Sequence, residues 1–341
     1  MIDIDEVVIS EMVLHRVSAE ENRCIISDQV ISPAEPEEVT LFKKVFLKPF
    51  ASHVSTFEFS HEVAIGYNVL FNLAKAIYSG EDFAENSKLI VQHLTSVSKH
   101  PNIKEGDLFI VKFEDVQLSN RHYQALGIYK FEEKENYIET SAVNKDMSFE
   151  FRKGIGNKKP DKAFLVIFSD EPYTLLVIDS NSIETDYWQN QFISHKPKND
   201  AINNTNDFLS LAKGFITEQI PQDFNVSKTD QIDYLNRSVE YFKSHDQFDK
   251  SEFEKEVFYH DEVIESFNNY NSTFRANSDI ELGDNFEISQ QAVKKQARAF
   301  KSVLKLDKNF HIYIHGNKDL IEHGVEQDGR KYYKIYYSQE S

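Results

Sequence analysis

Four basic side chains near the C-terminus have a spacing that suits contact with a phosphate backbone. They recur at i, i+4, i+7 and i+11, and so would share one face of a helix over 289–305: Lys294, Arg298, Lys301 and Lys305. Residues 294–308 contain six basic residues and one acidic residue, a local charge of +5. Such a row could bind phosphates without reading base sequence, although charged rows are also common on solvated helix faces.

A second basic segment lies at 152–159, where two glycines separate two pairs of cations. The four cations are Arg152, Lys153, Lys158 and Lys159. Glycine lets backbone amides approach an anion closely, so this segment could clamp duplex DNA as a loop. The alternative is an ordinary exposed hairpin loop, because the segment has neither a Walker ending nor a dinucleotide-binding third glycine.

The sequence contains no complete catalytic or metal-binding motif. His311 and His315 would share a strand face with Tyr313, but a metal needs further ligands that the sequence does not identify. Pro160-Asp161 could begin a metal-dependent nuclease pattern, yet the strand that follows offers only Asp179 and no acidic residue two positions before a lysine. We therefore predict no catalytic residues, no metal and no cofactor.

The net charge argues against a protein that coats DNA generally. The chain has 38 basic and 56 acidic residues, a net charge of −18, whereas a DNA-coating protein should be basic. Contact with DNA would therefore need a local basic patch on an acidic body, or else the partner is a protein.

The N-terminus and the cysteine content indicate a cytoplasmic protein. The first ten residues carry acids where a secretory signal needs a basic start, and no run approaches the roughly 18 apolar residues of a membrane span. The single cysteine, Cys24, cannot form an internal disulfide, which fits a reducing compartment.

Hydrophobic periodicity in the first 200 residues predicts helices and an antiparallel meander. Apolar residues at three-to-four spacing predict helices over 35–50, 69–77 and 83–97. Alternating or continuous apolar runs predict strands over 7–14, 24–30, 107–113, 125–131, 137–143, 149–151, 163–168 and 174–178. The last two runs are apolar throughout, so we expect both their faces to be buried.

The remainder of the chain has mainly helical periodicity. A polar break at 195–200 favours turns and suggests a domain boundary. Helices are predicted over 205–217, 227–243, 256–270 and 289–305, and strands over 310–314 and 332–337. Asp328-Gly329 before the last strand is a hairpin-turn signal. We thus predict an α+β protein, with a mixed domain over 1–200 and a mainly helical domain with a terminal hairpin over 201–341.

Several segments, in matching order along essentially the whole chain, resemble one protein family. They are 98–108 (SKHPNIKEGDL), 125–130 (ALGIYK), Tyr187-Trp188 with Phe192, Pro197 and Asp200, the 209–215 helix, and 307–316 (DKNFHIYIHG). Together they are similar to the bacterial nucleoid-associated (NdpA-type) family, in a Bacteroidetes-like branch. The resemblance implies association with the nucleoid, directly with DNA or through DNA-bound proteins, and no established chemistry.

We therefore expect a non-enzymatic, nucleoid-associated protein that contacts the DNA backbone through the two basic segments. The partners expected are double-stranded DNA, bound with weak or no sequence preference, and nucleoid proteins, with a homodimer as a further option and no membrane. One alternative is an acidic adaptor that binds the basic faces of DNA-processing enzymes. The second alternative is a metal-dependent nuclease, which requires carboxylates and histidines in one pocket.

Overall fold

The computed structural model describes most of the chain and divides it into two compact units. The described residues are 4, 6–51, 55–100, 102–118, 121–143 (143 by its backbone only), 146–180, 187–277, 282–298, 300, 303–314 and 320–339. Unit 1 is Met1–Lys198 and unit 2 is Asn199–Ser341. Both contain helices and antiparallel strands, which confirms the predicted α+β class. Among the described helices, none combines the length and the apolar character needed to cross a bilayer.

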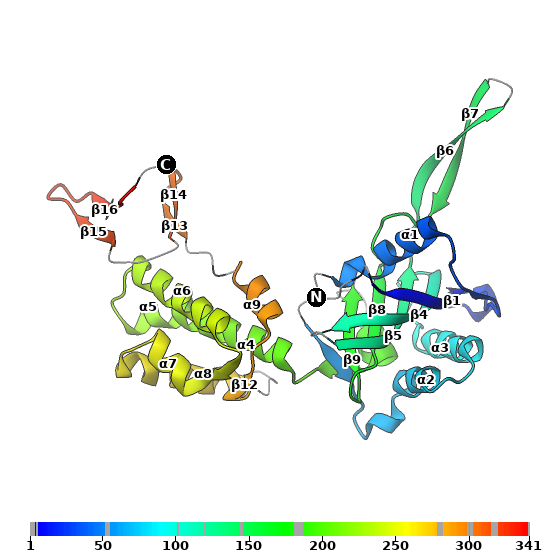
Figure 1. The fold of residues 1–341 in the computed structure, drawn as a ribbon, viewed down its shortest axis with the longest axis horizontal. Coiled ribbons are helices and arrows are strands. Elements are labelled where there is room, and N and C mark those ends of the chain that lie inside the picture. The colour runs from blue at the N-terminus through cyan, green and yellow to red at the C-terminus, as the bar shows by residue number, and fades with distance from the viewer. Residues whose placement is uncertain are drawn as a thin grey trace. The chain divides into compact units, whose positions relative to one another are not determined.

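Unit 1 is built on one antiparallel sheet of eight strands (Figure 1). Its strands are β1 (Val8–Val17), β2 (Val30–Ile31), β3 (Phe57–Phe59), β4 (Gly106–Leu118), β5 (Arg121–Phe131), β8 (Lys162–Ile167), β9 (Thr174–Asp179) and β10 (His195–Pro197). Their order across the sheet is β10-β3-β9-β8-β5-β4-β1-β2. The predicted strands over 107–113, 125–131, 163–168 and 174–178 form the antiparallel run β4-β5-β8-β9. The predicted strand over 24–30 shrinks to β2 and a single bridge between Arg16 and Ile25.

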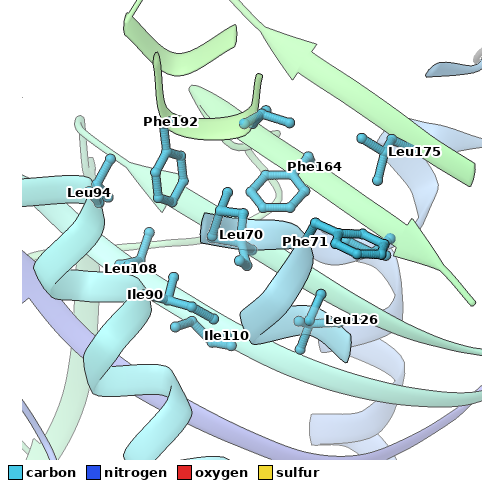
Figure 2. Packing of buried hydrophobic residues seen from close by; sticks show 14 of the residues in the cluster. Leu70, Phe71, Ile90, Leu94, Leu108, Ile110, Leu126, Phe164, Leu175 and Phe192 are labelled. Carbon is cyan, nitrogen blue, oxygen red and sulfur yellow. The ribbon is translucent and has the colours of Figure 1, made fainter. Parts of the chain in front are cut away.

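Helices cover both faces of this sheet, and the strands alternate between them. The helices are α1 (Pro36–Phe46), α2 (Val69–Tyr78) and α3 (Phe83–Val97). Leu108 and Ile110 of β4 join the core under α2 and α3, where Figure 2 shows them beside Ile90. Val111 and Phe113 of the same strand face the core under α1. All of β8 is buried, as its continuous apolar run predicts.

Strands β6 (Glu135–Val143) and β7 (Asp146–Gly154) do not join the sheet, contrary to the predicted meander. They pair only with each other and form a two-stranded ribbon that extends away from it (Figure 1). The reason is that β8 takes the edge of β5 that β6 would need, from Ala125↔Ile167 to Lys130↔Lys162. The ribbon is therefore an insertion between two strands that are direct neighbours.

Unit 2 packs short helices around a core rich in phenylalanine. The helices are α4 (Ala201–Gly214), the π-helix η5 (Phe215–Gln219), α5 (Ile220–Asp223), α6 (Lys228–Ser244), α7 (Lys250–Val257), α8 (Asp261–Asn277) and α9 (Gln290–Gln296). Phe208 lies at the centre, with the rings of Phe248 and Phe253 at centroid distances of 4.1 and 5.0 Å. The helix predicted over 256–270 is present as α8 but begins only at Asp261, because Tyr259 has a φ of 59° and separates α7 from α8.

Three small pairs of strands complete unit 2. Two are hairpins, β13–β14 (Val303–Leu306, Phe310–Tyr313) and β15–β16 (Ile321–Val325, Lys331–Ile335), whereas the strands of the third pair, β11 (Gln247–Asp249) and β12 (Asn285–Glu287), are separated by α7 and α8 and form a small two-stranded sheet. The β15–β16 turn contains Gly329 at a φ of 85°, which confirms the predicted terminal hairpin. The helix predicted over 289–305 is wrong beyond Gln296. Leu304 instead lies opposite Ile312 in a hairpin and is buried against Ile232 of α6.

Candidate nucleic-acid interface

Helix α9 carries Lys294 on its exposed side, and Arg298 lies in the turn that follows the helix. Ser289 caps the helix by accepting a hydrogen bond from the Ala292 backbone at 3.4 Å, as its position predicts. Ala292 and Val293 are buried in unit 2. Lys294 in the helix and Arg298 just after it are both exposed to solvent.

The last cation of the row lies on a different element from the one predicted. Lys305 is in β13, directly opposite His311 of β14. Leu304 and Ile314 face the Ile232 cluster, so the opposite face of the hairpin presents Lys305 and His311 to solvent. Lys301, which precedes Lys305 in the row, lies outside the described residues.

Lys294, Arg298 and Lys305 form no ion pair with a carboxylate of the described residues. The ion pairs in the later part of unit 2 involve Arg275, Arg330 and Lys334, not Lys294, Arg298 or Lys305. Burial lowers the pKa of the neighbouring Lys295, and the positive charge of Arg298 lowers it further. The segment thus gathers like charges, and an anion there would meet cations that no described carboxylate neutralises. We call Lys294, Arg298 and Lys305 the C-terminal cations.

The second predicted patch is largely neutralised. Arg152 lies on β7 and pairs with Glu139 at 3.0 Å and Glu150 at 2.8 Å. Lys158 follows the ribbon and lies 3.1 Å from Asp161 and 3.7 Å from Glu133.

Only Lys153 and Lys159 of that patch are exposed without an ion pair to a described carboxylate. They are separated along the chain by the turn after β7. A phosphate would therefore have to compete with three or more carboxylates to engage Arg152 and Lys158.

Unit 1 also contains a buried group of lysines and carboxylates that sequence reasoning missed. Lys162 Nζ lies 2.6 Å from Asp179 Oδ1, and Lys130 Nζ lies 2.9 Å from Glu132 Oε1. The four side chains are between 1 and 4% exposed. Asp161 Oδ2 accepts hydrogen bonds from the Glu132 and Glu133 backbones at 2.8 and 3.3 Å.

Lysines and carboxylates also occur in nuclease centres, but here they form ion pairs and hydrogen bonds with one another. Lys130 Nζ also donates to Tyr187 Oη at 3.1 Å and to the Lys104 carbonyl at 2.6 Å. Burial lowers the pKa of Lys130 and raises that of the Tyr187 hydroxyl. The group therefore joins β5, β8 and the π-helix η4 (Tyr187–Ile193) as a buried ionic network.

The residues of this group lie in segments that are far apart in the sequence and become neighbours only when the strands pair. Lys130, Lys162 and Asp179 are register partners on β5, β8 and β9. A search for an acidic residue near a lysine on one strand cannot find such a set.

Possible metal ligands converge at one place in unit 2 within the described residues. The ligand atoms of His245, Glu252 and Glu256 lie within 4.8 Å of one another, and both carboxylates are exposed. The histidine set noted in the sequence is not assembled among the described residues, because His311 is exposed on β14 and His315 lies outside them.

A comparison with protein-family models identifies one match. The model described as nucleoid-associated protein YejK matches residues 13–330. No curated protein and no solved structure gives a significant match.

Proposed function

The chain belongs to the family of nucleoid-associated protein YejK, and on that premise we propose that it binds the phosphate backbone of double-stranded DNA through the C-terminal cations. Binding has weak or no base preference, because lysine and arginine contacts to phosphate carry no sequence information. We further infer that it acts in the cytoplasm, at the nucleoid, as a binding protein rather than an enzyme, alone or together with nucleoid proteins.

The observation that carries this proposal is the contrast between the two basic segments. Lys294, Arg298 and Lys305 are exposed and form no ion pair with a described carboxylate, whereas Arg152 and Lys158 each contact two. DNA releases its condensed counterions only where protein cations are free to engage its phosphates. The C-terminal cations are therefore the principal site, and Lys153 and Lys159 give at most secondary contacts.

An acidic body makes this binding short-ranged and sensitive to salt. The net charge of −18 repels duplex DNA at a distance, so long-range steering is absent and contact depends on local pairing within about 8–10 Å. Three phosphate contacts give a slope of log K against log salt of about −2.7, at about −0.9 per contact.

Fluorescence anisotropy of a labelled duplex across a salt series tests the proposal. The test variant is Lys294→Glu, Arg298→Glu and Lys305→Glu. The matched control makes the same change in net charge at three exposed lysines of unit 1: Lys44, Lys48 and Lys99. The test variant should lose affinity and flatten the salt slope by about 2.7, whereas the control keeps the parent slope. Equal losses in both variants would refute a local site.

The net charge also favours a second candidate, an adaptor whose acidic surface binds basic faces of DNA-processing enzymes. This candidate predicts that the parent protein does not bind duplex near physiological salt. Parallel samples with magnesium or manganese test the nuclease alternative, because only a nuclease would cleave the DNA.

A further inference from the structure

The β6–β7 ribbon has two faces of opposite character, because neighbouring residues along a strand point to opposite sides. In its register Tyr137 lies opposite Arg152 and Ser141 opposite Ser148, while Ile138 lies opposite Phe151 and Thr140 opposite Phe149. The first two pairs share one face and the other two share the second. The strand pairing alone thus separates polar from apolar side chains.

The polar face pairs part of its own charges and its two serine hydroxyls. Arg152 bridges Glu139 and Glu150, and the Ser141 and Ser148 hydroxyls are 2.8 Å apart. All four carboxylates of the ribbon belong to this face by register: Glu135, Glu139, Asp146 and Glu150. It needs no partner beyond water.

The other face is apolar and exposed. Ile138, Met147, Phe149 and Phe151 are 58, 71, 63 and 75% exposed. The Phe149 and Phe151 rings meet edge to face at 5.7 Å, so they form one continuous patch. A two-stranded ribbon alone is at best marginally stable in water, and contiguous exposed apolar patches mark interaction sites. This ribbon therefore lacks a covering partner.

We propose that the apolar face of the ribbon, defined by Ile138, Met147, Phe149 and Phe151, packs against the same face of a second copy of the chain. The first argument is charge. Two copies at −18 each repel through most of their surfaces, and this face carries no carboxylate; its one charged member is Lys153, at the base of the ribbon. In a two-fold interface the same patch of both chains is in contact. Like charges on a charged patch would therefore repel each other, whereas an uncharged apolar patch can pack against its copy.

The second argument is area. At about 200 Å² for a large apolar side chain, the four exposed fractions correspond to about 500 Å² on each ribbon. Two ribbons face to face would bury about 1,000 Å² in total, which is the lower limit for a specific interface. The dimer is therefore weak and dissociates on dilution. It does not depend on the DNA contacts of the C-terminal cations.

Sedimentation and light scattering across the micromolar range test the dimer directly. The parent should approach twice the chain mass of 39.7 kDa as concentration rises. Phe149→Lys places like charges against each other across the two-fold axis, and Ser148→Lys adds the same charge to the opposite face of the same strand. We expect Phe149→Lys to raise the dimer Kd by about 30-fold or more, as for a central aromatic contact, and Ser148→Lys to leave it unchanged.

Cross-linking gives a second readout that does not depend on the lysine variants. In a Cys24→Ser background, single cysteines at Met147, Phe149 and Phe151 should form inter-chain disulfides on oxidation, whereas a cysteine at Ser148 should not. Circular dichroism confirms that each variant is folded.

Two results would overturn the proposal. One is a parent that stays monomeric throughout, in which case loss of duplex binding in Phe149→Ser would assign the ribbon to nucleic acid instead. The other is a dimer that Phe149→Lys leaves intact.

Discussion

Replacing Lys162 with methionine should destabilise unit 1 strongly. The Lys162–Asp179 pair has side chains 2 and 1% exposed and an N···O distance of 2.6 Å, so the change removes the ammonium group that contacts this buried carboxylate. Removing one partner of a buried pair costs about 3–5 kcal/mol. At about 2–4 °C per kcal/mol for a unit of this size, the melting temperature should fall by about 6–20 °C.

The double variant Lys162→Met/Asp179→Leu should recover most of that loss, because it removes both charges of this pair together. Replacing a whole buried pair with apolar residues is often neutral or stabilising. The coupling between the two sites should therefore be large, and a double-mutant cycle measures it.

Trp188 supplies the assay. It is the one tryptophan of the chain, it is completely buried, and it adjoins Tyr187, whose ring lies 5.2 Å from Lys162 Nζ. Its fluorescence during urea unfolding therefore reports on unit 1. A loss below about 1 kcal/mol in Lys162→Met, or additive losses in the double variant, would refute the structural role of the pair.

Two further predictions concern unit 1. His15 Nδ1 accepts the Ser27 backbone N–H at 3.1 Å and Nε2 lies 3.1 Å from Ser87 Oγ, and burial lowers its pKa to about 4. The neutral ring stabilises the fold above pH 6.5, so up to about 3 kcal/mol should be lost as pH falls from 6.5 towards 4. The stability advantage of the parent over His15→Gln in urea should shrink over that range; a constant difference contradicts the assignment. Separately, Gly127→Ala would place its Cβ against the fully buried Tyr129 ring, so we expect urea titration to show a loss of about 1–3 kcal/mol, whereas an unchanged midpoint would mean that the ring can move.

Much of unit 1 could be predicted from the sequence because each strand carries its own pattern. The alternation along 107–113 and the continuous run over 163–168 correspond to β4 and β8. Helix α3 has the predicted bounds, Phe83–Val97, because Asp82 caps it and Val97 is its last apolar contact. Such features depend on neighbours within a few residues.

The errors arose where distant residues decide the structure. Over 289–305 the spacing of Val293, Phe300 and Leu304 fits one helix, but pairing with β14 makes the last part a strand and moves Lys305 onto it. The spacing of apolar residues within 289–305 gives no information about pairing with β14.

The candidate site shows the same limit. The sequence does not show which cations of either basic segment have acidic partners, and only the fold brings Glu139 and Glu150 to Arg152. Which cations remain free is therefore a property of tertiary structure.

The ribbon is inserted between β5 and β8, so changes in its sequence and changes in the sheet are subject to different constraints. Because these strands pair directly from Ala125↔Ile167 to Lys130↔Lys162, the sheet keeps its register whatever the length of the segment that joins them. Insertions, deletions and substitutions in 135–154 can therefore accumulate without repacking the interior. Relatives of this protein can diverge in what the ribbon touches while they conserve the scaffold that carries it.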